Sequence, residues 1–450
     1  MNQSKLFFIL AIFLSLTFYS TAFSAVQKEW TVAVFLNADN NLDQFGVEDQ
    51  TEMAKVGSND WLNVVTLIAR QSGPAVYNYI ENGKITRIPG TPAVKLDMGD
   101  YRTLINFAKW VVANYPAKKY ALVIWNHGSG WKKGKVTRGI SYDDSTNNYI
   151  KTNELGVALN EIKTAIGHNL DILDMDACLM QMAEVAYECL NKVDFIVASE
   201  EVEPGKGTPY DDVLNSLSKD SAPEDFAKAW VKAYGASYNH GSQGDESCTQ
   251  SCIKVSELGV VYDAMNGLVK SAMSGKFNDG FSKALKSVKK FEDSDNIDLI
   301  HFAQLLKGLI PDESIKTASD KLIAASQNAV IACSNIGQEN VNAFGLAAYF
   351  PIAQPTFDDN YKNLDFSAAV KWEGMILDYY NKNKADSVIT NASNGNVTAL
   401  KAYVAGADPK NKKLNRFVAQ KINFELNSGK KLPRSVVAET NELVRTLLAK

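Results

Sequence analysis

One cysteine and one histidine have the surroundings that acyl-transfer chemistry requires. His127 follows the apolar run 120–124, and Cys178 follows the apolar run 170–173. A thiol attacks a carbonyl carbon as the thiolate, so it needs a base within reach and backbone N–H groups that hold the oxyanion. The two residues therefore supply the minimum equipment for thiol-based acyl transfer.

The two apolar runs are typical of buried strands, and they predict where these side chains lie. Parallel strands bring their carboxyl ends to one edge of a sheet, where catalytic groups collect in α/β proteins. Gly128 lets the backbone approach a substrate oxygen, and the amide of Cys178 opens a helical pattern at 179–190, where unpaired amides and the helix dipole favour negative charge. We therefore predict that the amides of Gly128 and Cys178 are the oxyanion donors.

The surroundings of both residues resemble the clostripain-like cysteine peptidases, which are relatives of caspases, gingipains and legumains. The resembling segments are WTVAVFLNADNNL at 30–42, YPAKKY at 115–120, WNHGSGW at 125–131, DMDACLM at 174–180 and FGLAAYFP at 344–351, followed by Trp372. Several ordered motifs are more specific than one alone. The resemblance covers about residues 30 to 383. It implies a caspase-like fold, with a mostly parallel sheet flanked by helices on both faces, and an endopeptidase with Cys178 as nucleophile and His127 as base.

Asp176 is the residue that the resemblance links to substrate preference. It lies two residues before Cys178, so both side chains point to the same face of an extended strand. In the resembling family an acidic residue at this place lines the pocket for the side chain before the cut, which implies cleavage after Arg or Lys. The alternative is a carboxylate that only caps the following helix.

The loop at 199–210 resembles the other wall of the family's substrate pocket. It adds three substrate-binding candidates: Ser199, Glu200 and Lys206. Some relatives carry an acid near the place of Lys206, and a lysine there opposes a cationic substrate. Three acids of the loop can compensate: Glu200, Glu201 and Glu203. The sequence thus predicts a basic preference and leaves the compensating acid open.

Alternating strand and helix patterns predict the α/β architecture. Strand-like runs lie at 30–36, 62–69, 119–125, 170–174 and 193–198, and helical stretches lie at about 101–114, 152–166 and 179–191. The segment 75–90 is typical of an inserted hairpin. The predicted divisions are a signal peptide at 1–25, a caspase-like catalytic core at 26–220, a helical region at 221–383 that returns to the core sheet at 345–350, a linker at 384–398 and a basic C-terminal helical unit at 399–450.

The N-terminal residues have the pattern of an export signal, with Lys5, an apolar run at 6–18 and small residues up to Ala25. The run is shorter than the roughly 20 residues that a spanning helix needs, and no other segment qualifies. We therefore expect a secreted or periplasmic protein with no transmembrane segment in the mature chain.

The charge is uneven along the chain. The net charge of −4 gives no reason to expect a nucleic-acid partner, but residues 401–450 hold 11 Lys/Arg against 4 Asp/Glu. This basic tail can make an electrostatic contact with the acidic body of the protein or with an anionic envelope surface. A solvated helical appendage is the alternative. Protein or peptide substrates are the expected partners.

The four cysteines other than Cys178 are expected to be structural. Cys248 and Cys252 lie four apart in a polar loop and can form a disulfide. Cys189 and Cys333 lie in helical patterns, where small buried hydrophobes are expected.

No cofactor is required by this chemistry, and calcium is left open. Two groups are rich enough in oxygen to bind it: Asp39, Asn40, Asn41 and Asp43, and Asp143 with Asp144. Neither group is an EF-hand loop, and Asx turns explain both equally well.

The resulting hypothesis is an exported cysteine endopeptidase that cuts after Arg or Lys and processes itself between His127 and Cys178. The basic residues of that stretch are Lys132, Lys133, Lys135, Arg138 and Lys151. One alternative is a transpeptidase or ligase on the same dyad, and the other is a non-catalytic binding protein on a peptidase scaffold. A second His-Gly pair begins at His240, which is interpreted as a helix-end histidine because it follows the helical stretch 226–238.

Overall fold

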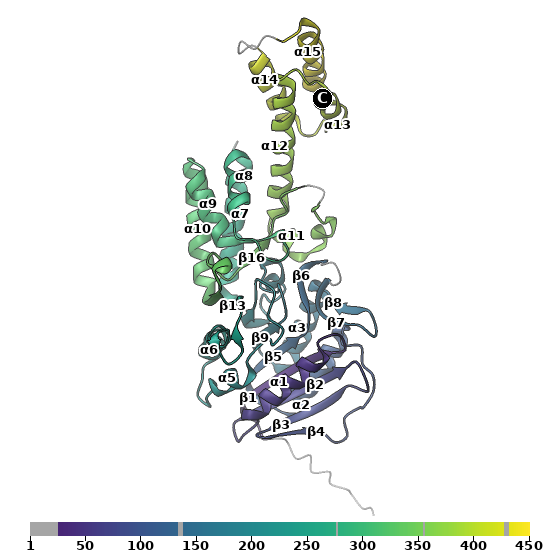
Figure 1. Ribbon diagram of the computed structural model, residues 1–450, viewed down its shortest axis with the longest axis vertical. Helices are drawn as coiled ribbons and strands as arrows, with labels where there is room; N and C mark the ends of the chain where they lie inside the picture. The colour runs from purple at the N-terminus through teal and green to yellow at the C-terminus, as the bar shows by residue number, and fades with distance from the viewer. Residues whose placement is uncertain (1–25, 134–137, 276–277, 354–355, 427–431) are drawn as a thin grey trace, which may run out of the picture.

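A nine-stranded sheet forms the body of the protein in the lower part of Figure 1. The structure is a computed structural model that describes residues 26–133, 138–275, 278–353, 356–426 and 432–450. The middle of the sheet consists of five parallel strands, in spatial order β10 (Val193–Ala198), β9 (Leu170–Asp176), β5 (Ala117–Trp125), β1 (Lys28–Ala38) and β2 (Leu62–Arg70). The predicted parallel sheet is confirmed. The predicted signal peptide lies outside the described residues.

Alternate residues of the central strands enter two hydrophobic cores, one on each face of the sheet. In β1, Phe35 belongs to one core and Val34 to the other. A nearly continuous apolar run such as β1 therefore marks a strand buried on both faces. The helices on one face are α2 (Tyr101–Asn114) and α3 (Thr152–Ile166), and those on the other face are α1 (Asp43–Val56), α5 (Tyr210–Asn215) and α6 (Pro223–Ser237). Helices thus cover both faces, as predicted.

Both edges of the sheet are antiparallel. At one edge, β3 (Val76–Glu81) and β4 (Lys84–Arg87) form the predicted hairpin. At the other edge, β13 (Cys248–Lys254) pairs with β10, and β15 (Val330–Ile336) pairs with β13. The sequence analysis placed a polar loop and a helical pattern in these two segments, which is wrong. Their small and polar residues lack the apolar runs that mark the central strands.

The extended conformation of β13 also rules out the predicted disulfide. Cys248 and Cys252 are both buried on this strand, and both are free thiols. Four residues of extended chain span roughly 13 Å, whereas the Cα atoms of a disulfide are at most about 7 Å apart. Cys333 lies on β15 and is exposed, so the prediction of a buried thiol is wrong there, while Cys189 is buried as predicted.

The region after the core is mainly helical. Its long helices are α7 (Leu258–Ser274), α8 (Asn278–Ser287), α9 (Leu299–Leu309) and α10 (Glu313–Ala329). The expected return to the core sheet at 345–350 is wrong, because β16 (Ala347–Tyr349) pairs with β14 (Asn296–Asp298) in a separate sheet. Strand β15 makes the return instead.

Smaller elements surround the sheet. Two further small sheets consist of β6 (Gly128–Lys133), β7 (Arg138–Asp143) and β8 (Asn148–Ile150), and of β11 (Asn239–Gly241) and β12 (Gly244–Asp245). The short helices are α4 (Ala183–Tyr187), η1 (Val255–Glu257), η2 (Gln338–Asn340), η4 (Asp359–Asn363) and α11 (Asp365–Ala369).

The segment predicted as a linker is largely helical. Helix α12 (Trp372–Ser393) runs from the body of the protein into the C-terminal unit (Figure 1). A stripe of apolar residues at helical spacing is buried against that unit: Ala385, Val388, Ile389 and Ala392. The unit itself contains α13 (Thr398–Gly406), α14 (Lys412–Leu426) and α15 (Arg434–Ala449). Within the described ranges, we find no helix with the length and apolar character needed to cross a membrane.

Candidate active site

Cys178 lies in the turn that follows β9. Its Sγ accepts a hydrogen bond from the backbone N–H of Glu203 at 3.3 Å, and burial raises the pKa of the thiol. The helical pattern expected at 179–191 is only α4 (Ala183–Tyr187), and Leu179 has a positive φ of 63°. The amide of Cys178 is therefore not at a helix N-terminus, and the dipole argument for the oxyanion is wrong. The amide itself stays a candidate donor by its place beside the sulfur.

His127 follows β5, the strand next to β9 in the sheet. Its Nε2 is 2.7 Å from Oδ1 of Asn41. An amide oxygen only accepts hydrogen bonds, so this contact assigns the proton to Nε2 and leaves Nδ1 as the basic nitrogen. Burial lowers the pKa of His127. The sequence pointed to Asn41 only as a calcium candidate, although the turn that carries it follows β1, the strand adjacent to β5.

The thiol and the imidazole line one cavity of about 140 Å³. Its lining residues are Leu42, Trp125, Asn126, His127, Asp176, Ala177, Cys178, Glu203, Pro204, Gly205 and Gly207. In the part of the chain that the structure describes, no hydrogen bond joins the thiol of Cys178 to the imidazole of His127, as is common in free enzymes before substrate tightens the site. The pKa shifts of both groups favour a neutral thiol and a neutral imidazole in this state.

Gly128 begins β6 beside the turn of Cys178. A Cβ atom at this position would lie 2.4 Å from the carbonyl oxygen of Cys178. Real Cβ atoms do not approach a backbone oxygen that closely, so only glycine allows the chain after His127 to pass the turn of Cys178. This packing holds the two predicted oxyanion residues next to each other.

Two carboxyl groups line the cavity, those of Asp176 and Glu203. Asp176 is 4% exposed and accepts hydrogen bonds from the hydroxyl of Tyr210 at 2.8 Å and from the amide of Thr208 at 3.4 Å. Burial raises the pKa of Asp176, and burial together with the charge of Asp176 raises the pKa of Glu203 well above its usual range.

The other predicted pocket residues lie outside this cavity. Ser199 Oγ bonds Thr249 Oγ1 and the carbonyl of Glu201, both at 2.9 Å. Glu200 is buried and accepts the amide of Gly345 at 2.8 Å. Lys206 is exposed, and its Nζ donates to the carbonyl of Gln243 at 3.1 Å. Of the three compensating acids named from the sequence, only Glu203 lines the cavity.

Three of the carboxylates considered for calcium make other contacts. Asp39 pairs with Lys95 at 2.5 Å, and both oxygens of Asp43 bind Arg70, at 2.8 and 2.7 Å. Asp143 accepts two backbone amides, those of Met98 and Thr146. Across the described residues, no three His, Cys, Asp or Glu side chains are arranged to hold a metal ion.

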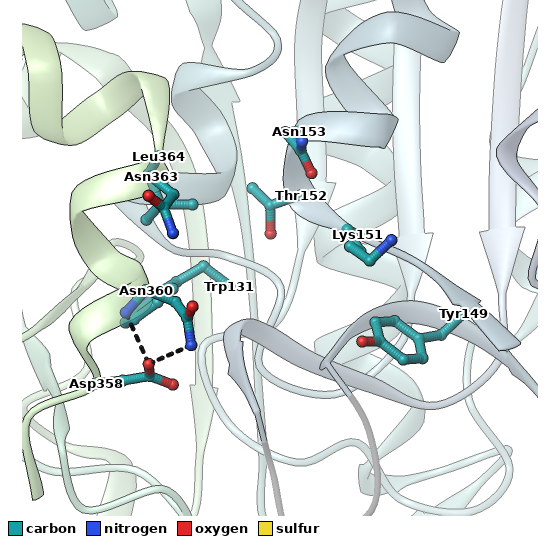
Figure 2. A pocket seen from close by; sticks show the side chains of 9 residues that line it. All are labelled: Trp131, Tyr149, Lys151, Thr152, Asn153, Asp358, Asn360, Asn363 and Leu364. Carbon is teal, nitrogen blue, oxygen red and sulfur yellow. Dashed lines mark hydrogen bonds between the residues drawn. The ribbon is translucent and has the colours of Figure 1, made fainter. Parts of the chain in front are cut away.

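A second cavity, of about 310 Å³, lies between the β8–α3 junction and η4 (Figure 2). It is lined by Trp131, Tyr149, Lys151, Thr152, Asn153, Asp358, Asn360, Asn363 and Leu364. The ammonium of Lys151 is paired with the carboxylate of Glu154 at 2.7 Å. The carboxylate of Asp358 accepts hydrogen bonds from the backbone N–H of Asn360 at 2.9 Å and from its side-chain amide at 2.8 Å. This lining includes no histidine or cysteine, so the smaller cavity is the candidate active site. His240 lies on β11 and is exposed, with its Nδ1 3.2 Å from Oδ2 of Asp245. It does not line the cavity of Cys178 and His127.

A thiol and an imidazole at the carboxyl edge of a mostly parallel sheet are the arrangement of an α/β cysteine peptidase. The model of the clostripain family matches residues 34–416, and the chain therefore belongs to the clostripain family. Clostripain from Hathewaya histolytica is 31% identical over 227 residues, and this match spans 42% of this chain and 42% of clostripain, less than half the length of that relative.

Solved structures of the family share the fold. A secreted C11 cysteine protease from Bacteroides thetaiotaomicron, in complex with an irreversible peptide inhibitor, superposes with a TM-score of 0.60 at 20% identity, over 78% of this chain and 99% of that one. An inactive zymogen of a C11 protease from Parabacteroides distasonis superposes with a TM-score of 0.61 at 22% identity, over 77% and 99%.

Proposed function

We propose that this protein is an exported cysteine endopeptidase that cuts peptide bonds after Arg or Lys through His127 and Cys178. The observation that carries the proposal is a single cavity that is lined by the thiol, the imidazole and two carboxyl groups. At about 140 Å³ it is smaller than the roughly 300–1,000 Å³ of pockets that enclose whole ligands, which suits one substrate side chain.

The proposed reaction begins from the neutral thiol–imidazole pair. Nδ1 of His127 takes the thiol proton as the sulfur of Cys178 bonds to the substrate carbonyl carbon, and the oxyanion is held by the amides of Gly128 and Cys178. The imidazolium then gives the proton to the departing amine as the C–N bond breaks. Water, deprotonated by the same imidazole, hydrolyses the thioester and frees the sulfur.

Labelling of the thiol tests the proposal directly. A peptide that ends in an arginine with a thiol-directed electrophile should modify wild-type protein at Cys178 only, and Cys178→Ala should remain unlabelled. Hydrolysis should vanish in Cys178→Ala and nearly vanish in His127→Ala, because the two groups act as a unit. His240→Ala, which alters a histidine outside the cavity, should hydrolyse like wild type. Turnover by purified Cys178→Ala would contradict the proposed dyad, and interception of the acyl-enzyme by an added amine would favour the transpeptidase alternative.

Self-processing is part of the proposal. The basic residues between His127 and Cys178 include Lys151, which is exposed, whereas Lys135 lies outside the described residues. Mass spectrometry of wild type beside Cys178→Ala should find two fragments in the wild type and one chain in the variant. Intact chains in both would reject self-cleavage and leave peptide hydrolysis untouched.

A further inference from the structure

Asp176 and Glu203 are two acids that line the same small cavity. The cavity has a volume of about 140 Å³, and its described lining holds no lysine or arginine that could balance two negative charges. Two carboxylates that share such a site repel each other, so one of them keeps its proton. The pair then carries one proton and one negative charge.

The surroundings of the pair hold this proton in place. The titratable groups that face it are Asp49 on α1, Asp174 on β9, Tyr210 on α5, Tyr234 and Tyr238 on α6 and at its end, and Cys178 and His127 on the walls of the cavity. No lysine or arginine belongs to the described lining of the cavity, and Lys206 bonds the carbonyl of Gln243 instead. Burial raises the pKa of both members of the pair, and the charge of Asp176 raises the pKa of Glu203 further.

Two hydrogen-bond donors fix Asp176 but not Glu203. Tyr210 and Thr208 both donate to Oδ2 of Asp176, while Oε1 of Glu203 is buried without a partner among the described residues. Gly207, with φ of +59°, brings the loop so close that a Cβ atom would lie 2.8 Å from Oδ1 of Asp176. Asp176 is therefore a fixed acceptor, and Glu203 is the carboxyl group with an unused oxygen.

We propose that Asp176 and Glu203 share one proton in the free enzyme and that an arginine or lysine side chain entering the cavity displaces it to solvent. The inference rests on the proposed function, because it assigns the chemistry of the same pocket. The exchange is balanced in charge: the protonated pair carries −1, and the two carboxylates together with the bound cation also carry −1. Glu203 is in this way a specificity-determining residue that makes recognition of basic side chains depend on pH.

A pair of matched substrates isolates this effect. Citrulline has the shape of arginine without the charge, and both substrates use the same thiol and imidazole, so the titration of the dyad cancels in their ratio of kcat/KM. In wild type this ratio should rise with pH between 5.5 and the pKa of the pair, by up to about tenfold per pH unit when one proton is released. In Glu203→Gln the ratio should be lower at high pH and independent of pH, because a glutamine amide donates to Asp176 without sharing a proton.

The controls separate this inference from the proposed function. Glu246→Gln removes an exposed carboxylate outside the cavity and should keep the wild-type pH profile. A wild-type ratio that favours arginine equally at every pH would overturn the proton exchange and leave the proposed function standing. A wild type without arginine preference at any pH would overturn the proposed specificity itself.

A binding measurement keeps the inference testable if Glu203→Gln does not fold. Cys178→Ala protein is titrated at pH 6 with the arginine peptide in two buffers of different ionisation enthalpy, which gives the number of protons released. We expect about one proton for the arginine peptide and none for the citrulline peptide. Binding of the arginine peptide without proton release would overturn the exchange.

Discussion

Asn41 shows how one side chain determines which imidazole nitrogen does the chemistry. It lies 86 residues before His127 in the chain, yet its Oδ1 is 2.7 Å from Nε2 of that histidine, because β1 and β5 are neighbours in the sheet. The contact fixes both the orientation of the ring and the tautomer. If His127 is the base, as proposed, Asn41 is a positioning residue for it.

Replacement of this residue gives the first prediction. Asn41→Ala should lower kcat by roughly ten- to hundredfold and leave KM nearly unchanged. This loss is smaller than the roughly 10²–10⁴-fold rate increase that a positioned base contributes as a whole. Steady-state kinetics with a single peptide substrate measure the split. Gln44→Ala, an exposed change nearby, is the matched control. A variant with wild-type kcat would show that Asn41 does not orient the imidazole.

Asp176 gives the second prediction. Asp176→Asn keeps the acceptor for Tyr210 and removes the charge, so basic substrates should lose roughly 1.5–3 kcal/mol of charge-assisted binding while neutral substrates are spared. Lys206→Met, which changes a charge outside the cavity, should alter the same values less than threefold. Profiling of a peptide library with the three proteins checks both statements. An unchanged profile for Asp176→Asn would contradict the basic pocket.

At the scale of elements, the loop after β10 forms the cavity by its backbone as much as by its side chains. The amide of Glu203 reaches the sulfur, and Gly207 passes directly over Asp176. Gly207→Ala should therefore reduce kcat/KM for arginine substrates by at least tenfold, because the added Cβ would displace the loop or the carboxylate. Gly73→Ala introduces the same positive-φ strain with no atom within 4 Å and should leave activity unchanged. Equal activities of both variants would contradict this role of the loop.

The central strands were predictable because their sequences are almost continuously apolar. Such runs occur in parallel strands buried on both faces, and they placed Cys178, His127 and Asp176 at one edge of the sheet. Strands β13 and β15 lack this signal, since pairing with the edge of an existing sheet stabilises polar residues that alone favour no strand. The predicted helix at 179–191 is longer than the observed helix α4 (Ala183–Tyr187). The apolar residues that follow Cys178 enter the core from a turn and not from a helix face.

The choice of Glu203 among three acids could not be made from sequence. All three lie within four residues of one loop, and their directions depend on partners far away in the chain. Glu200 turns toward Gly345, and Glu201 pairs with Lys289 at 3.3 Å. Only the folded positions of these partners leave Glu203 as the acid that faces Asp176.

At the scale of the molecule, several carboxyl groups are buried away from the active site, and they make stability depend on pH. Glu184 is fully buried; its Oε1 accepts the amide of Tyr349 at 3.0 Å and the hydroxyl of Tyr361 at 2.9 Å. Burial raises the pKa of Glu184 from 4.5 to about 7. Between these values the folded protein holds a proton that the unfolded chain has released, so the free energy of unfolding falls as pH rises through this window.

Glu184→Gln should remove this part of the pH dependence. Glutamine resembles the protonated acid and keeps both contacts, so the variant should be more stable than wild type at pH 8 by on the order of 3 kcal/mol and similar to it near pH 4.5. Urea unfolding at several pH values measures the difference. Glu161→Gln, an exposed acid on α3, should follow the wild-type curve. Parallel curves for wild type and Glu184→Gln would contradict the assignment.

Helix α12 makes the C-terminal unit a rigid extension of the peptidase body. Its 22 residues correspond to roughly 33 Å of continuous helix, whereas an Asn- and Ser-rich coil of the same length would sample many separations. Such a helix is a semi-rigid spacer and not a flexible linker. The length of α12 therefore sets the separation between the C-terminal unit and the body that carries Cys178.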